Sequence, residues 1–315
     1  MKILFGFFEF LIDVVGFILA KIPHCLFYGV IKALASLLRF LDKKRYKNAR
    51  ANLDFVFGDT YTTEQKKQII KRCYENFVFV ILESIRLPFL NKDAYLKRFD
   101  FQGKDNLFSL LKENKKVVLV SAHYGYWESL GTAIPLQMQK ELQNYKNYDM
   151  FSLGRLTNFD FINQMIIKRR EIFNVRLIDK KGAFRKLLKI YSASNAVGTG
   201  ILIDQNMSKD EGIEIDFLAK KATQTPITSI LSRRFDVYLV PILIDFNKDY
   251  SKYTMHIYPS IQTPQTSNMQ QDILEATIAQ VKIIENAIKT NPSNWFWFHK
   301  RFKSFYPEIY SKTNH

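Results

Sequence analysis

The stretch Lys116-Val117-Val118-Leu119-Val120-Ser121-Ala122 decides the expected fold of this chain. An apolar run of this length, bounded by polar segments, is typical of a strand buried inside a sheet. His123-Tyr124-Gly125-Tyr126-Trp127-Glu128 follows it directly, so the strand would place a histidine at the end of the sheet. Gly125 supplies the backbone freedom that a turn after His123 needs.

His123 and Glu128 are the residue types of a hydroxyl-activating pair. On a straight helix a five-residue step rotates a side chain to a position about 140° away, so the two meet only if His123 lies in a turn before the next helix begins. An imidazole can then take the proton of an alcohol, while a carboxylate on its other ring nitrogen fixes the tautomer and stabilises the imidazolium. The alternative is a buried histidine and a solvated glutamate that share this spacing by chance.

The chain offers no evident nucleophile for a covalent acyl-enzyme. It contains no G-x-S-x-G elbow, and neither Cys25 nor Cys73 has a histidine in a recognisable setting. Direct attack by an acceptor hydroxyl is the simpler prediction. The two cysteines fit a reducing compartment, and the dispersed histidines indicate no metal site.

Helix-type and strand-type patterns alternate outward from the first strand. Helices are expected over residues 63–86, 107–112, 127–140, 159–173, 183–193, 227–234 and 271–290, and strands over 117–122, 148–153, 175–178, 197–204, 237–246 and 253–261. This order predicts an α/β fold with a largely parallel central sheet flanked by helices. Ligands of such folds gather at the carboxyl ends of strands, where His123 and Asp204 fall. Pro241 needs a bulge or an edge position within its strand.

The N-terminus predicts a membrane anchor. Residues 3–20 are almost wholly apolar and would form a helix about 27 Å long, close to the roughly 30 Å hydrocarbon core of a bilayer. Glu9 and Asp13 interrupt the run on one helical face, so an amphipathic or tightly packed anchor competes with a single span, and a core helix of the domain is a third alternative. We expect anchoring helices over residues 1–42 and one catalytic domain over residues 43–315.

Charge narrows the choice of partner. The chain has 46 Lys and Arg against 30 Asp and Glu, a net charge of +16, which favours an acidic partner. Aromatic residues make up 15% of the chain, and this tilts the choice from nucleic acid toward a membrane interface or a lipid pocket. The basic residues over 43–50 that follow the apolar region predict that the body lies on the cytoplasmic face.

Several segments in order resemble the bacterial late acyltransferases of lipid A biosynthesis, the lauroyl and myristoyl transferase family. His123 and Glu128 match its HxxxxD/E motif, and Glu83-Ser84-Ile85-Arg86-Leu87-Pro88 precedes them as in the family. Further matching segments are Arg155 with Asn158, the pair Asp204-Gln205, the segment 216–223, Pro241, and the C-terminal Pro292-Ser293-Asn294-Trp295-Phe296-Trp297-Phe298-His299-Lys300-Arg301-Phe302-Lys303.

The resemblance implies transfer of a fatty acyl chain from acyl carrier protein to a hydroxyl of an anionic lipid A precursor. It places the enzyme at the cytoplasmic face of the bacterial inner membrane, with no cofactor beyond the carrier-bound acyl donor. His123 would deprotonate the acceptor hydroxyl and Glu128 would hold its tautomer. Backbone N–H groups near Gly125, with Arg155, would meet the oxyanion.

The remaining matched residues have roles that the sequence leaves open. Asp204 would orient Arg155 or a substrate group, or else cap a helix. Trp295 and Trp297 would lie at the headgroup boundary or in the core. Candidate substrate-binding residues, with a solvated basic face as the alternative for the cations, are Arg155, Asn158, Asp204, Gln205, Lys220, Lys221, His299, Arg301 and Lys303.

Two other functions remain in view. One keeps the pair and the fold but acylates another glycolipid or a phospholipid, with acyl-CoA as donor. The other is a basic peripheral membrane or nucleic-acid-binding protein, for which the charge is the main support. No helix-turn-helix, RNP-type strand or zinc-finger spacing is present, so no nucleic acid partner is expected.

Overall fold

The computed structural model of the chain describes residues 2–143, 145–154, 160–194 and 196–311. At its centre is a seven-stranded sheet in the order β1-β9-β8-β2-β5-β3-β4. The strands are β1 (Phe99–Gln102), β2 (Val117–Ser121), β3 (Asp149–Gly154), β4 (Val175–Asp179), β5 (Val197–Leu202), β8 (Tyr238–Phe246) and β9 (Tyr253–Ile257). The pair β8–β9 is antiparallel and the other pairs in this sheet are parallel. The predicted α/β class with a largely parallel sheet is confirmed.

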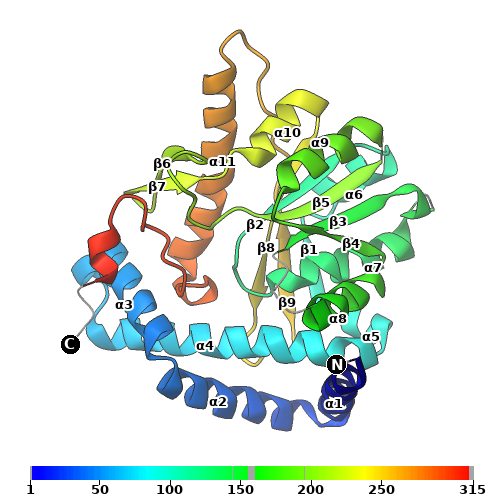
Figure 1. The fold of residues 1–315 in the computed structure, drawn as a ribbon, viewed down its shortest axis with the longest axis vertical. Coiled ribbons are helices and arrows are strands. Elements are labelled where there is room, and N and C mark those ends of the chain that lie inside the picture. The colour runs from blue at the N-terminus through cyan, green and yellow to red at the C-terminus, as the bar shows by residue number, and fades with distance from the viewer. Residues whose placement is uncertain (1, 144, 155–159, 195, 312–315) are drawn as a thin grey trace.

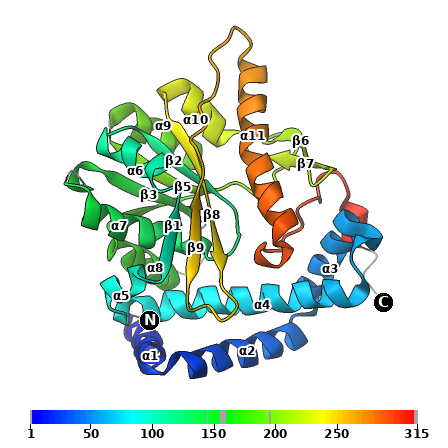
Figure 2. The ribbon, with the colours of Figure 1, turned by 180° about the vertical axis from the view of Figure 1, so that it is seen from behind.

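Helices cover both faces of this sheet. Figures 1 and 2 show α9 (Ala183–Ala193) and α10 (Ile227–Phe235) on one face, and α7 (Ala133–Glu141) and α8 (Asp160–Glu171) on the other. Further helical elements here are α5 (Lys92–Leu96), α6 (Asp105–Lys112), α11 (Met269–Thr290) and the short 3-10 helices η2 (Leu87–Phe89), η3 (Trp127–Gly131), η4 (Tyr145–Asn147), η5 (Pro292–Asn294) and η6 (Pro307–Tyr310). All five residues of β2 are buried, as the apolar run predicts.

The N-terminal helices pack beneath this layer. α2 (His24–Leu41) lies along α4 (Thr63–Arg86), and α1 (Lys2–Lys21) packs across the C-terminal end of α4 (Figure 1). α3 (Lys43–Phe57) and η1 (Gly58–Thr60) precede α4 in the chain. α4 begins at a capping box, in which Thr62 and Gln65 bond each other's backbone N–H. Gly16 lets α1 approach closely, since a Cβ there would lie 2.5 Å from the Ile85 carbonyl oxygen.

The two acids inside the apolar N-terminal run have partners on the body. Glu9 pairs with Lys168 at 2.7 Å and Asp13 with Arg169 at 2.9 Å, both from α8. The helices also enter the common core, because Phe27 is buried and its ring lies under the Arg86 guanidinium. By length and composition, α2 could cross a membrane, and little of it is buried.

Three local expectations change. The helix expected over 127–140 is divided into the 3-10 helix η3 (Trp127–Gly131) and α7. Strand β1 and the antiparallel hairpin of β6 (Ile213–Phe217) and β7 (Lys220–Gln224) were not predicted. Pro241 lies in β8, which is internal to the sheet, so its edge alternative is wrong. The bulge alternative fits, because Ile242 faces Ile257 but Leu239 faces Ile261, which shifts the register by one residue.

Candidate active site

His123 lies on a tight turn at the carboxyl end of β2, and a C-terminal segment holds that turn. Gly125 has φ +56 and donates its N–H to the Asn294 carbonyl, at 2.9 Å. The N–H of Phe296 donates to the His123 carbonyl, also at 2.9 Å. A Cβ at Gly125 would lie 1.5 Å from the Ile244 oxygen, so only glycine fits this position.

Asp204 is the carboxylate that contacts the His123 ring. Its Oδ1 lies 2.8 Å from Nδ1, and its Oδ2 accepts the backbone N–H of His123 at 3.0 Å. The indole Nε1 of Trp295 donates to the same Oδ2 at 2.8 Å. Asp204 follows β5, the parallel neighbour of β2, so the shared edge of the two strands brings the pair together.

The ionised form of Asp204 fixes the histidine tautomer. Burial alone would raise the pKa of this carboxyl, but the His123 ring, followed by His299 and the Trp295 donor, holds it well below its usual range. An ionised carboxylate only accepts hydrogen bonds, so Nδ1 of His123 carries the proton. In the neutral ring Nε2 then keeps its lone pair, which is the form a general base needs.

The prediction that Glu128 contacts the His123 ring is wrong. Both residues are described, and no hydrogen bond joins them. The Oε2 of Glu128 instead accepts from Nη2 of Arg170 at 2.8 Å, and Nη1 of the same arginine donates to Ser152 on β3. The turn does separate His123 from the following helix, as expected, but it sends Glu128 toward α8, whereas His123 faces Asp204.

His299 is the second imidazole of the site. Its ring centroid is 5.0 Å from that of His123, and burial, followed by the neighbouring His123, lowers its pKa to about 4. Gln205 lies between His299 and Lys180: its Oε1 accepts from Nζ of Lys180 at 2.8 Å, and its Nε2 is 3.5 Å from Nε2 of His299. His299 is therefore neutral at pH 7, when it can exchange hydrogen bonds but offers no positive charge to a phosphate.

Comparison with known proteins decides the family. The sequence model of the bacterial lipid A biosynthesis acyltransferases matches residues 2–304. The chain belongs to this family. It is 23% identical to the lipid A biosynthesis palmitoleoyltransferase of Escherichia coli, over 90% of this chain and 87% of that protein. It is 22% identical to the lipid A biosynthesis lauroyltransferase of the same organism, over 91% and 88%.

A solved structure among those that match aligns only loosely. It is the 1-acyl-sn-glycerophosphate acyltransferase PlsC of Thermotoga maritima, with a TM-score of 0.38, 11% identity and coverage of 84% of this chain and 99% of that one. A likeness at this level carries no argument. Membership of the lipid A acyltransferase family makes this chain an O-acyltransferase of the late lipid A type, and implies a lipid A-type glycolipid as acceptor.

Several residues that the family resemblance suggested for substrate have structural partners instead. Arg301 is 0% exposed and donates to the carbonyls of Gln205 and Thr223 and to the side chain of Gln224, so its expected phosphate contact is corrected. Burial lowers the pKa of this guanidinium to about 10, which leaves it charged at pH 7. Through these bonds Arg301 fixes the loop that follows Asp204 against β7.

The lysines expected to bind phosphate and the backbone N–H expected to bind the oxyanion also have partners within the protein. Lys220 lies over the Phe55 ring, and Lys221 pairs with Glu214 within the β6–β7 hairpin. The Gly125 N–H is already bonded to Asn294, so it is not the oxyanion donor that the sequence suggested. Arg155 and Asn158 lie outside the described residues. No group of three or more metal-ligating side chains occurs within the described ranges.

Two functional contacts escaped sequence reasoning. Trp295 and Trp297 are buried, which confirms core packing and excludes the headgroup boundary, but Trp295 also bonds Asp204. Asp245 on β8 accepts from the Tyr124 hydroxyl at 2.8 Å and from Nδ2 of Asn294 at 2.6 Å. It thereby joins the two segments that carry His123 and Trp295. Parallel β2–β8 pairing could have suggested that a carboxylate there lies near His123.

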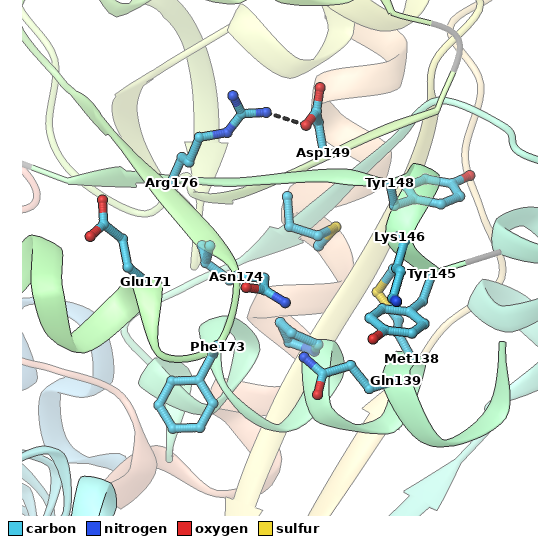
Figure 3. Close-up of a pocket in the computed structure, with 13 residues that line it drawn as sticks. Met138, Gln139, Tyr145, Lys146, Tyr148, Asp149, Glu171, Phe173, Asn174 and Arg176 are labelled. Atoms are coloured by element: carbon cyan, nitrogen blue, oxygen red, sulfur yellow. Dashed lines mark hydrogen bonds and ion pairs between the residues drawn. The ribbon is translucent and has the colours of Figure 1, made fainter. Parts of the chain in front are cut away.

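Cavities occur at both edges of the sheet. A cavity of about 490 Å³, drawn in Figure 3, is lined by Asp149, Asn174 and Arg176 where β3 and β4 begin. His123 lies at the carboxyl edge of parallel strands, so this cavity is at the wrong edge to serve it. A cavity of about 960 Å³ is lined by Ile203 and Gln205, the two neighbours of Asp204 in the chain.

Proposed function

We propose that this protein transfers a fatty acyl chain from acyl carrier protein to a hydroxyl of a lipid A precursor, at the cytoplasmic face of the bacterial inner membrane. The observation that carries the proposal is the His123–Asp204 pair at the carboxyl edge of β2 and β5. It supplies a base of fixed tautomer beside a cavity, in a chain of the lipid A acyltransferase family.

The proposed chemistry is a direct transfer. Nε2 of His123 takes the proton of the acceptor hydroxyl as its oxygen attacks the thioester carbonyl carbon. The tetrahedral intermediate then collapses, the carbon–sulfur bond breaks, and the imidazolium returns the proton to the leaving thiolate. Asp204 stabilises the imidazolium through Nδ1, and general-base action of this kind contributes about 10²- to 10⁴-fold in rate.

Glu128 enters this proposal as a positioning residue. Its carboxylate holds Arg170, and Arg170 is tied to Ser152, so the segment after the His123 turn is fastened to β3. If Glu128 acts through Arg170, then Glu128→Gln and Arg170→Gln should each lower kcat by about tenfold, and the double variant should lose little more. If the fold losses in kcat of the two single variants multiply in the double variant, then Glu128 acts independently of Arg170.

Membrane attachment by α1 and α2 is part of the proposal. Their outer faces expose large apolar side chains, among them Phe8, Phe10, Val15, Phe17, Ile18, Leu34, Leu37, Phe40 and Leu41. The Glu9 and Asp13 ion pairs tie α1 to α8, and an α1 that left the body to span the bilayer would break them. We therefore favour helices that lie in the membrane interface over a single span.

The reaction is tested with purified protein, a lipid A precursor, and matched acyl chains on acyl carrier protein and on CoA. The expected result is a product heavier by one acyl chain, formed faster from the carrier protein. Mass spectrometry of lipid A from cells with and without this protein then identifies the chain. No product from either donor with any lipid A precursor would reject the proposed function, while faster transfer from CoA would reject only the donor.

A further inference from the structure

Helix α9 and the turn before it carry positive charge that no ion pair with a described residue balances. The exposed cations of this region are Lys181, Arg185, Lys186 and Lys189. None of them forms an ion pair with a described residue, and α9 itself contains no acidic residue. Like charges three or four residues apart on a helix repel each other, so the stability of α9 does not explain this arrangement.

The basic run on α8 shows the contrasting case. Its consecutive cations Lys168, Arg169 and Arg170 each pair with a carboxylate of another element, at distances between 2.7 and 2.9 Å. Those charges hold the fold together. The charges of α9 are left over, and an exposed cluster of one sign attracts a partner of the opposite sign.

The geometry of α9 gathers these charges on one surface. Arg185, Lys186 and Lys189 are three and four residues apart, which makes them neighbours on the helix, and Lys181 precedes the first turn. The Phe184 side chain, in that first turn, is 43% exposed. Arginine and exposed aromatic rings are the side chains that protein interfaces favour, so this surface has the composition of a protein-binding site.

We propose that the α9 surface, formed by Lys181, Phe184, Arg185, Lys186 and Lys189, docks the acyl carrier protein that delivers the donor thioester. The inference rests on the proposed function and deepens it by placing the partner on the molecule. Acyl carrier proteins are small, acidic and helical, so their charge is complementary to that of the α9 surface. Complementary charge speeds association and fixes the orientation of the two proteins.

The α9 surface begins beside the residues that lead to the reacting ring. Lys180, the neighbour of Lys181, donates from Nζ to Oε1 of Gln205 at 2.8 Å. Nε2 of Gln205 is 3.5 Å from Nε2 of His299, and the rings of His299 and His123 are 5.0 Å apart. A carrier protein on α9 would therefore hold its thioester arm next to the path toward His123.

The place of α9 in the molecule favours a soluble partner over a lipid surface. The exposed apolar side chains of α1 and α2 form the proposed membrane contact, and these helices lie at one end of the molecule. α9 lies away from them across the sheet (Figures 1 and 2). A bilayer that meets α1 and α2 leaves α9 open to water, so the carrier protein can bind while the acceptor remains in the membrane.

The test compares two donors that share one acyl chain and differ in what carries it. One is the acyl carrier protein, and the other is acyl-pantetheine, a thioester with no protein attached. Arg185→Glu combined with Lys189→Glu reverses two charges of the α9 surface, so kcat/KM with the carrier-bound donor should fall by at least about tenfold, mainly through KM. The rate with acyl-pantetheine should remain that of the wild type, because this donor has no acidic surface to dock.

A matched control makes the same change in net charge elsewhere. Lys248→Glu combined with Lys282→Glu reverses two exposed lysines, one between β8 and β9 and one on α11. This control should keep the wild-type kcat/KM with both donors. The loss in the α9 variant should shrink between about 0.1 M and about 1 M salt, where the Debye length falls from about 10 Å to about 3 Å.

The contrary outcomes differ in meaning. Equal losses in the two double variants would reduce the effect to net charge and overturn the inference. A loss with both donors would assign the α9 charges to the chemistry or the fold, and would also overturn it. Unchanged kinetics in the α9 variant, with transfer intact, would reject the docking surface and leave the proposed function standing. If that variant instead lost binding to anionic phospholipid vesicles, the α9 surface would belong to the membrane contact.

A cross-linking measurement is independent of turnover. A carbodiimide, which joins lysine amines to carboxylates in contact with them, is added to the full-length protein and the carrier protein in detergent. Cross-links from Lys181, Lys186 or Lys189 to the carrier, mapped by mass spectrometry, would support the docking surface even if no transfer were observed. Cross-links from Lys248 or Lys282 in their place would contradict it.

Discussion

Two histidine–aspartate contacts of nearly equal length, among those that the described residues make, lie in very different surroundings. His123 lies 2.8 Å from Asp204, whose side chain is 0% exposed, at the carboxyl edge of two parallel strands. His256 lies 3.0 Å from Asp245, and both of these side chains are about 30% exposed, on the antiparallel strands β8 and β9. A close imidazole–carboxylate contact is therefore not enough to identify the reacting pair.

The partners of each aspartate explain the difference. The carboxyl groups of Asp204 and Asp245 both have a pKa below the usual range, although burial by itself would raise each pKa. Asp204 contacts the His123 ring and accepts hydrogen bonds from the His123 backbone and from Trp295, so all three contacts hold the carboxylate beside the reacting ring. Asp245 contacts His256 through Oδ2, and its Oδ1 accepts hydrogen bonds from Tyr124 and Asn294, which joins two chain segments. The first pair is built for chemistry and the second for position.

The two histidines should give the largest contrast. His123→Ala removes the general base, so we expect kcat to fall by about 10²- to 10⁴-fold with the fold retained. His256→Ala removes a partly exposed hydrogen bond, and kcat should change by less than about threefold. Both are measured as initial transfer rates, with circular dichroism as the folding control. Equal losses in the two variants would remove the distinction between the pairs.

The two aspartates should differ in kind as well as in size. Asp204→Asn offers an amide in place of the acceptor carboxylate, which frees the His123 tautomer, so kcat should fall by about 10²-fold or more with little change in KM. Asp245→Asn should chiefly lower the free energy of unfolding, by about 1–3 kcal/mol. Denaturant titration beside kinetics separates the two effects. A selective kcat loss in Asp245→Asn would assign it a part in the chemistry.

The two neighbouring tryptophans provide a finer comparison. Both are buried donors: Trp295 bonds Asp204, whereas Trp297 bonds the Pro292 carbonyl. Each Trp→Phe change removes one hydrogen bond and some volume, so each should destabilise the fold by about 1–3 kcal/mol. Only Trp295→Phe should also lower kcat, by roughly tenfold, because it loosens Asp204. Equal kcat values for the two variants would show that the Trp295 contact is purely structural.

Sequence patterns predicted the architecture better than the partnerships within the site. The run before His123 gave a buried strand, and helix α9 has the predicted bounds of residues 183–193. β1 was missed because four residues carry too little periodicity, and the β6–β7 hairpin because Leu218 and Ala219 make its turn with positive φ. The partner of His123 was missed because Glu128 was near in sequence, whereas Asp204 comes near only through β2–β5 pairing.

The smallest expected effect is the pH dependence of the free energy of unfolding. It comes from His299, whose ring lies beside the His123–Asp204 pair. The folded pKa of His299 is about 4, below the ordinary value of 6.5, so the unfolded chain binds this proton first on acidification. The free energy of unfolding should therefore fall between pH 6.5 and pH 4, by up to about 3 kcal/mol. The low pKa of Asp204 adds a further loss only below about pH 4, where the unfolded carboxyl takes up its proton.

Denaturant titration at pH 7, 5.5 and 4.5 measures this slope. His299→Asn should flatten it, because no titrating imidazole is left beside His123. If the slope survived His299→Asn, His299 would not be the source of the acid sensitivity.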